Sequence, residues 1–172
     1  MNKKSVGVIG GGAWGTGLAQ ALARGNHNVQ IWALEQDVVD SINNEHENKR
    51  FLAGFKLSEK LTATTNIIEA ASNKDFLIIA SPSLFLASTI KKIVDVPNVA
   101  SGKTIIASLT KGFVPTANGP KLILETMEEA LPASYKDSTV YIAGPSHAEE
   151  VAAGKITGLV AASTNPRNSI KV

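Results

Sequence analysis

The stretch VGVIGGGAWGTGLAQALA, residues 6–23, joins a short apolar run to a run of alanine and leucine through a cluster of glycines. Six of its first twelve residues are glycine. β-Branched residues such as those in Val6–Ile9 favour a buried strand, whereas alanine and leucine are strong helix formers. The stretch therefore predicts a strand, a tight turn and a helix over Trp14–Arg24.

The rest of the chain continues this alternation of strand and helix patterns. Further strands are predicted at Val29–Trp32, Leu61–Thr64, Phe76–Ala80, Thr104–Leu109, Val140–Ala143 and Leu159–Ala162. Further helices are predicted at Asp37–Asn43, Ile67–Ala71, Leu84–Val94, Pro120–Leu131 and Ala148–Ala153. The polar, glycine-broken segment His46–Leu57 indicates a loop. Because such alternation is typical of βαβ units, we predict a Rossmann-like α/β fold with a doubly wound, mostly parallel sheet and helices on both faces.

Composition narrows the class of protein. A chain of 172 residues with 44% hydrophobic and 19% charged residues is typical of one globular domain. No apolar run approaches the roughly 20 residues that span a bilayer, and the first residues lead into a strand rather than a signal peptide. We therefore expect residues 1–172 to form one cytoplasmic domain without an integral membrane segment.

The same composition argues against three kinds of site. There is no cysteine, which excludes disulfides and thiolate chemistry. The histidines His27, His46 and His147 have no ligand-like spacing, so we expect no metal site. A net charge of +2 with interspersed signs offers no basic stripe, so we expect no nucleic-acid partner.

The glycine turn has the spacing of a dinucleotide-binding motif. Gly10, Gly12 and Gly15 satisfy G-x-G-x-x-G between a predicted strand and helix, which is the context that makes this motif informative. Gly10 would allow the turn, Gly12 the approach of a pyrophosphate, and Gly15 close packing of helix on strand. The alternative is a glycine-rich turn that binds no ligand.

An acidic residue completes the motif. Glu35 lies twenty residues after Gly15, behind the second predicted strand, where a carboxylate would bind ribose hydroxyls. No arginine adjoins it to accept a 2′-phosphate, so the cofactor predicted is NAD rather than NADP. Alternatively, Glu35 only favours the positive end of the next helix.

Later strand ends carry polar groups where ligands of parallel sheets bind. Lys111 follows one strand, and its ammonium there would polarise a substrate carbonyl; most lysines, however, are merely solvated. Gly144 follows another strand, which suggests close approach of an anionic group. Ser146 and Glu149 have the spacing of a capping box. Phe85 would flank a nicotinamide or lie in the core.

Seven motifs carry a family resemblance across the whole chain. They are GGGAWGTGLA, VQIWALE, INNEHENKRFL, FKLSEKL, SPSLF, SLTKGF and AGPSHAEEVA. Together they resemble the N-terminal half of the bacterial NAD(P)-dependent glycerol-3-phosphate dehydrogenases. The resemblance implies hydride transfer between sn-glycerol 3-phosphate and dihydroxyacetone phosphate, which feeds phospholipid synthesis.

The resemblance also assigns residues by position. For the cofactor it implies Gly10, Gly12, Ala13, Trp14, Gly15, Ala33, Leu34, Glu35, Phe51, Pro82, Phe85, Lys111 and Ala148. For the substrate it implies Lys111, Gly144 and Ser146, with Lys111 polarising the carbonyl.

The chain departs from the family pattern in two ways. Many bacterial members resemble WAHR where this chain has WALE, so that Leu34 and Glu35 replace His-Arg, which favours NAD over NADP. The family also continues into an all-helical domain that carries the acid/base lysine, the phosphate-gripping residues and most of a homodimer contact. This domain is expected to be missing here. Thr164–Val172 reads as the start of a helix cut short, and the chain alone is expected to bind cofactor without turnover.

Two other functions are compatible with parts of the pattern. One is a stand-alone module that senses NAD(H) and catalyses nothing. The other is a different two-domain Rossmann dehydrogenase, such as a β-hydroxyacid dehydrogenase, against which SLTKGF and AGPSHAEEVA argue together.

Overall fold

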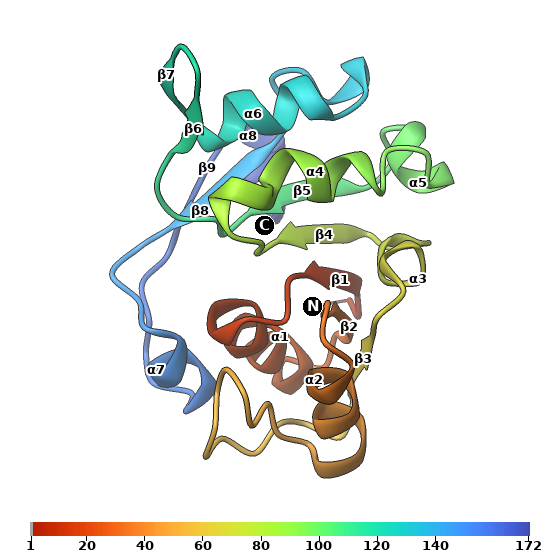
Figure 1. Ribbon diagram of the computed structural model, residues 1–172, viewed down its shortest axis with the longest axis vertical. Helices are drawn as coiled ribbons and strands as arrows, with labels where there is room; N and C mark the ends of the chain where they lie inside the picture. The colour runs from red at the N-terminus through yellow and green to blue at the C-terminus, as the bar shows by residue number, and fades with distance from the viewer. Residues whose placement is uncertain (1) are drawn as a thin grey trace.

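Seven strands form one twisted sheet in the computed structural model, which describes residues 2–172 (Figure 1). Their order across the sheet is β3-β2-β1-β4-β5-β8-β9. The strands are β1 (Ser5–Ile9), β2 (Asn28–Trp32), β3 (Leu61–Thr64), β4 (Phe76–Ile79), β5 (Ile105–Ser108), β8 (Val140–Ala143) and β9 (Val160–Ala162). All neighbours pair in parallel except β9, which runs antiparallel to β8. The predicted Rossmann-like sheet is confirmed.

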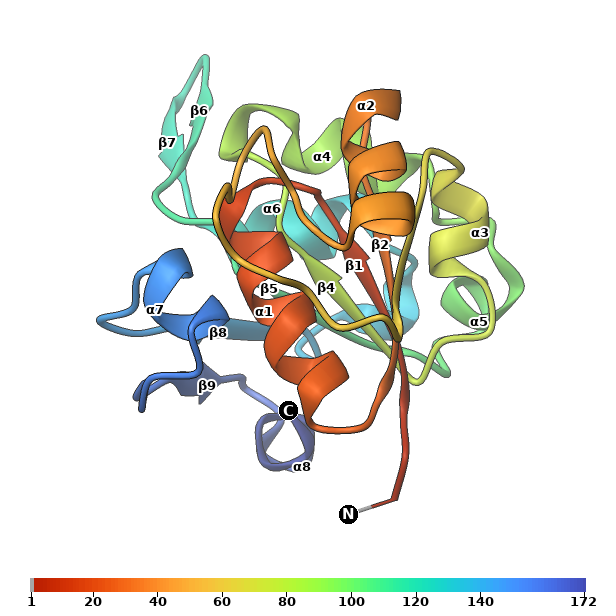
Figure 2. The same ribbon diagram turned by 90° about the horizontal axis from the view of Figure 1, so that it is seen from below.

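Helices cover both faces of this sheet (Figure 2). They are α1 (Ala13–Arg24), α2 (Gln36–Asp40), α3 (Ile67–Ala71), α4 (Leu86–Lys91), α5 (Pro97–Ala100), α6 (Ile123–Ala130), α7 (Ala148–Ala152) and α8 (Pro166–Lys171). Short helical turns of other types are η1 (Ser41–Glu45), η2 (Ser83–Phe85) and η3 (Ala133–Tyr135). None of the helices within residues 2–172 has the length and apolar character needed to cross a membrane.

Side chains of alternate strand residues enter two separate cores. Val6 and Val8 of β1 belong to the cluster under α1, whereas Ile9 belongs to the cluster under α3, α4 and α6. In β4, Ile78 belongs to the cluster under α1 and Leu77 to the cluster under α3, α4 and α6. Because successive strand residues point to opposite faces, an unbroken apolar run is what a sheet covered on both sides requires.

The predicted helix Pro120–Leu131 is wrong at its start. Two short antiparallel strands, β6 (Val114–Thr116) and β7 (Gly119–Lys121), precede α6 and project from the body as a hairpin (Figure 2). Gly119 has a φ of +106°, which residues with side chains rarely adopt. The pair Asn118-Gly119, at which the turn meets β7, is a known turn signal that the helical pattern obscured.

Smaller differences concern segment ends. The predicted helix Leu84–Val94 begins as η2 and is α-helical only over α4. The predicted helix Asp37–Asn43 is α2 followed by η1, and it ends at His46, whose φ is +54°. The loop expected at His46–Leu57 is confirmed, with one bridge between Asn48 and Leu52.

Tyr135 provides a test of stability against pH. Its buried hydroxyl donates to the Thr104 carbonyl at 3.0 Å, and burial raises the pKa of Tyr135 to about 12. The unfolded chain releases this proton near pH 10, so the free energy of unfolding should fall as the pH rises from about 10 to about 12. In urea titrations, the stability advantage of the wild type over Tyr135→Phe should shrink by about 2 kcal/mol across that window. A constant difference would contradict this role of Tyr135.

Candidate functional site

The glycine turn lies where the sheet changes its winding direction. β1 has β2 on one side and β4 on the other, and both neighbours are parallel to it. The turn follows the carboxyl end of β1, with Gly10 N–H donating to the Trp32 carbonyl at 3.0 Å. In open α/β sheets, ligands bind outside the carboxyl ends of strands at such a switch point.

Each motif glycine occupies a different environment. Gly10 has a φ of +136°, and a Cβ there would lie 2.7 Å from the Ala80 carbonyl carbon. A Cβ at Gly15 would overlap the Gly10 carbonyl oxygen. At Gly12, by contrast, a Cβ would meet no atom within 4 Å, so the chain itself does not require glycine at this position. The open side of Gly12 is therefore where a ligand would approach the turn.

The start of α1 offers N–H groups to an anion. Gly12 is the N-cap residue, and no side chain caps this end. The first N–H groups of a helix have no intrahelical acceptor, and the helix dipole adds positive potential there. The turn and this helix end fit the pyrophosphate of a dinucleotide.

A second group of predicted residues surrounds a cavity of about 210 Å³ beside the turn. Its walls are Trp14, Leu109, Lys111, Tyr141, Ile142, Ala143, Gly144, Ser146 and Leu159. Lys111 Nζ lies 5.2 Å from the centre of the Trp14 ring and 3.5 Å from the Ser146 carbonyl oxygen. A tryptophan face attracts an ammonium. Lys111 is thus held at the cavity by α1 and by the segment before α7.

Two buried donors at this end of the sheet lack partners. Trp14 Nε1 and Ser81 Oγ make no hydrogen bond within residues 2–172, although neither atom is accessible. Ser81 follows β4, next to the glycine turn. Unpartnered buried polar atoms are uncommon in folded proteins, and here they adjoin a site suited to a polar ligand.

The structure corrects two interpretations of the segment 144–149. A Cβ at Gly144 would lie 2.5 Å from the Gly158 carbonyl oxygen, so the chain's own backbone explains this glycine without a ligand. Ser146 and Glu149 form no capping box, because the N-cap of α7 is His147 and Ser146 Oγ donates to the Gly144 carbonyl at 3.2 Å.

The remaining predicted residues lie around the turn with different exposure. Ala33 is buried, and its Cβ would lie 2.6 Å from a Cβ at Gly11. Leu34, Phe51 and Phe85 expose their side chains. Pro82 precedes η2 after β4. Ala148 is buried at the start of α7, where its carbonyl approaches Gly17 of α1.

Sequence reasoning missed Asn48 and Tyr141. Asn48 is completely buried in the loop and bonds the glycine turn, and Tyr141 lines the cavity that holds Lys111. The burial of an asparagine in a polar loop has no local sequence signal. Tyr141 lies one residue inside a predicted strand, and strand alternation alone does not say which face meets a ligand.

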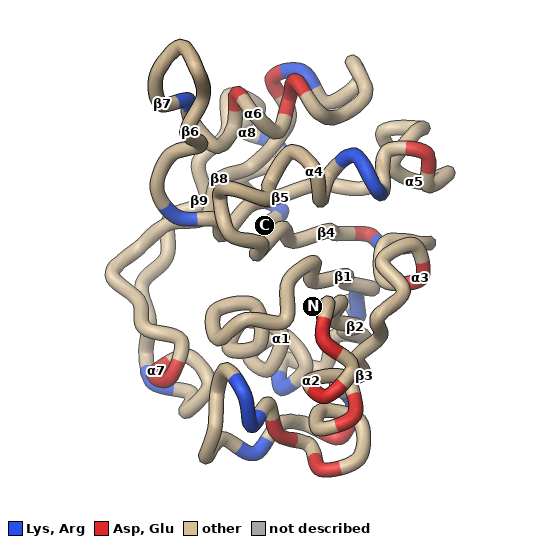
Figure 3. Tube along the Cα trace, in the orientation of Figure 1, with Lys and Arg blue, Asp and Glu red and all other residues tan. Residues whose placement is uncertain are grey.

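The end of the candidate site near Glu35 and α2 carries several acidic residues. Acidic residues gather on α2 and the segment after it (Figure 3). Glu35, the N-cap residue of α2, makes no side-chain hydrogen bond to the helix. Arg50 of the loop lies 3.3 Å from the Asp37 carboxylate and is thereby paired. This end has a negative character that suits neutral hydroxyls better than a phosphate.

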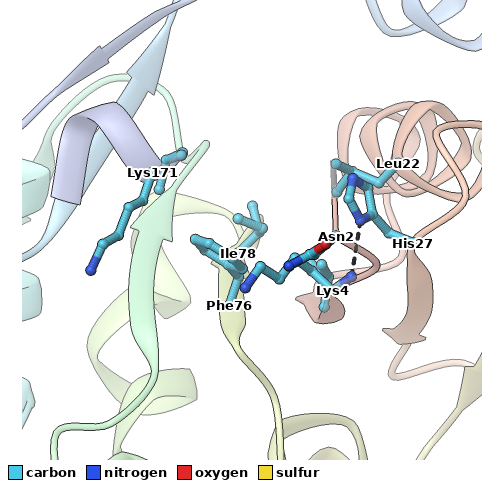
Figure 4. A pocket seen from close by; sticks show the side chains of 9 residues that line it. Asn2, Lys4, Leu22, His27, Phe76, Ile78 and Lys171 are labelled. Atoms are coloured by element: carbon cyan, nitrogen blue, oxygen red, sulfur yellow. Dashed lines mark hydrogen bonds between the residues drawn. The ribbon is translucent and has the colours of Figure 1, made fainter. Parts of the chain in front are cut away.

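A larger cavity of about 310 Å³ lies at the other end of the sheet (Figure 4). Val6 and Phe76, near the amino ends of their strands, line it together with Lys4, His27 and Lys171. None of the residues predicted to bind a ligand faces it. Among residues 2–172, no group of three or more His, Cys, Asp or Glu side chains is arranged so that it could hold a metal ion.

Known proteins with similar sequences share one description. A glycerol-3-phosphate dehydrogenase [NAD(P)+] from Treponema denticola is 43% identical over 99% of this chain, which matches 49% of that protein. A Treponema pallidum relative of the same description is 39% identical, over 98% of the chain and 50% of the relative. The chain spans about half the length of the curated relatives it matches.

A solved structure and a family model agree with these relatives. The crystal structure of glycerol-3-phosphate dehydrogenase from Coxiella burnetii superposes with a TM-score of 0.84 at 30% identity, over 98% of this chain and 49% of that one. The model of the NAD-dependent glycerol-3-phosphate dehydrogenase N-terminus matches residues 5–169. The chain therefore belongs to the family of NAD-dependent glycerol-3-phosphate dehydrogenase N-terminal domains.

Proposed function

We propose that this chain binds NAD(H) at the glycine turn and serves as the cofactor-binding half of an enzyme that interconverts sn-glycerol 3-phosphate and dihydroxyacetone phosphate. For the longer protein we propose a second, helical domain, a cytoplasmic homodimer and a role in phospholipid supply, as in the family it resembles. One observation carries the cofactor proposal: Gly12 is open to its surroundings at an uncapped helix start, while Gly10 and Gly15 are confined by the chain.

Lys111 supplies the chemistry that this half contributes. When bound, the nicotinamide would exchange a hydride with carbon 2 of the substrate. The Lys111 ammonium, held by the Trp14 ring and the Ser146 carbonyl, is suited to stabilise the negative charge that develops on the substrate oxygen. Trp14 and Leu109 would limit the access of water to this cavity.

Calorimetric titration of the 172-residue chain with NADH tests the proposal. We expect one saturable site, with competition from ADP-ribose, because the glycine turn recognises the pyrophosphate that both share. Absence of binding at millimolar NADH would refute it.

Glu35 should make the site prefer NADH to NADPH. Its carboxylate would accept hydrogen bonds from ribose hydroxyls and repel a 2′-phosphate. We expect NADH to bind about tenfold more tightly, which corresponds to about 1.4 kcal/mol. Glu35→Gln should reduce this ratio by strengthening NADPH binding, as measured by fluorescence titration of both cofactors.

A matched control separates this effect from net charge. Asp40→Asn removes one negative charge from the other end of α2 and should leave the NADH to NADPH ratio unchanged. Equal affinities of the wild type for both cofactors would mean that Glu35 only favours the start of α2. Arg50, although paired with Asp37, would then be the group to examine.

A further inference from the structure

The loop His46–Leu57 is fastened to α1 at two points by buried amide side chains. Near its start, Asn48 of the loop bonds the glycine turn. At its far end, Gln20 of α1 donates to the Lys56 carbonyl at 3.2 Å and accepts from Ser58 N–H at 2.7 Å. The two attachments are similar in chemistry, but only the first touches the proposed phosphate site.

The Asn48 side chain has partners for all its polar atoms. It is fully buried, and its Nδ2 lies 2.8 Å from the Gly11 carbonyl oxygen and 2.8 Å from Thr16 Oγ1. Its Oδ1 accepts the N–H of Phe51 at 3.0 Å. The reverse amide orientation would face oxygen toward the Gly11 carbonyl and NH₂ toward an N–H, so these partners fix the orientation.

This bond sets the direction of the next peptide N–H. In a trans peptide, the carbonyl of one residue and the N–H of the next point in opposite directions, and residues 2–172 contain no cis peptide. Because Asn48 holds the Gly11 carbonyl toward the loop, the Gly12 N–H points away from it. No hydrogen-bond acceptor for this N–H occurs within the described residues.

We propose that Asn48 is a positioning residue for the cofactor site: by binding the Gly11 carbonyl it directs the Gly12 N–H toward the pyrophosphate. The same side chain accepts the N–H of Phe51, so the Asn48 side-chain amide fixes the backbone of both the loop and the glycine turn. The inference rests on the proposed binding of NAD(H), and it concerns how the turn is kept ready for an anion before the anion arrives.

The test compares Asn48→Leu with Gln20→Leu. Each variant removes one buried amide that attaches the loop to α1, but Gln20 has no contact with Gly11 or Thr16 among its hydrogen bonds. ADP-ribose affinity is measured by calorimetry and folding by thermal melting. The position of the Gly12 amide resonance is measured by NMR without ligand.

Asn48→Leu should weaken ADP-ribose binding about tenfold and move the Gly12 resonance. Gln20→Leu should bind within about twofold of wild type and leave that resonance in place, even if it melts earlier. Wild-type affinity in Asn48→Leu, or equal losses in the two variants, would overturn the proposal.

Thr16→Val provides a milder variant in case Asn48→Leu does not fold. It removes one acceptor of Nδ2 and the 3.3 Å bond from Thr16 Oγ1 to Gly11, but it keeps the Asn48 bond to the turn. Because the Asn48 bond to Gly11 remains, we expect Thr16→Val to bind ADP-ribose within about threefold of the wild type, and a loss of tenfold or more would contradict the proposal by making Thr16 the residue that positions the turn. If the wild type binds no ADP-ribose, the proposed function fails, while the Gly12 resonances of the variants still decide whether Asn48 positions the turn.

Discussion

Gly12→Val is expected to lower NADH affinity about 100-fold without unfolding the chain. A Cβ at Gly12 meets no protein atom within 4 Å, so the substitution is compatible with the folded turn. The added side chain would instead occupy the space next to the uncapped start of α1. Lost hydrogen bonds between phosphate and N–H groups account for about 2.7 kcal/mol, which equals this fold-change. Calorimetry with NADH measures the loss.

Gly158→Val is the matched control for this prediction. A Cβ at Gly158 also meets no atom within 4 Å, and Gly158 lies in the segment between α7 and β9 and does not itself line the cavity beside the turn. This variant should bind NADH as the wild type does. Unchanged NADH affinity in a folded Gly12→Val would remove the turn from the proposed cofactor site.

The second large effect concerns catalysis by this chain alone. We expect the 172 residues to oxidise NADH with dihydroxyacetone phosphate at least about 10³-fold more slowly than the full-length Treponema denticola relative. Lys111 is the one lysine or arginine that lines the cavity beside the turn, within the described part of the chain. One ammonium cannot both hold the substrate phosphate and stabilise the charge on the reacting oxygen.

The lower rate expected of this chain comes from two missing contributions, a positioned acid or base and a grip on the substrate phosphate. A positioned acid or base contributes about 10²–10⁴-fold, and among residues 2–172 the only ionisable side chain besides Lys111 in the cavity wall is Tyr141. Without a grip on the phosphate, remote binding energy no longer orients the carbonyl.

The measurement follows the absorbance of NADH at saturating substrate for the wild type, Lys111→Ala and Tyr141→Phe. Near-background rates in all three are expected. Robust turnover by the wild type would refute the need for a second domain. Its loss in one variant would then identify Lys111 or Tyr141 as the proton donor.

Local patterns were sufficient for most of the fold. Runs such as Val6–Ile9 and Phe76–Ile79 are apolar on both faces, and only a sheet covered on both sides buries such strands. The helix after Gly12 follows from alanine and leucine. The hairpin at Val114–Lys121 was missed because its proline-containing strands carry little β signal. Its Asn-Gly turn was present in the sequence but was read as the approach to a helix.

The sequence by itself determined the sheet, the glycine turn and the family, because strand and helix periods and a turn motif depend on residues close together in the chain. Only the tertiary structure decided that Asn48 donates to the Gly11 carbonyl and that Lys111 lies over the Trp14 ring. It also decided that the Gly158 carbonyl leaves no room for a Cβ at Gly144. Each of these contacts joins residues at least 14 positions apart, as Gly144 and Gly158 are. Their partners are set by how loops pack on α1 and across strand ends, and local residue preferences carry no information about that packing.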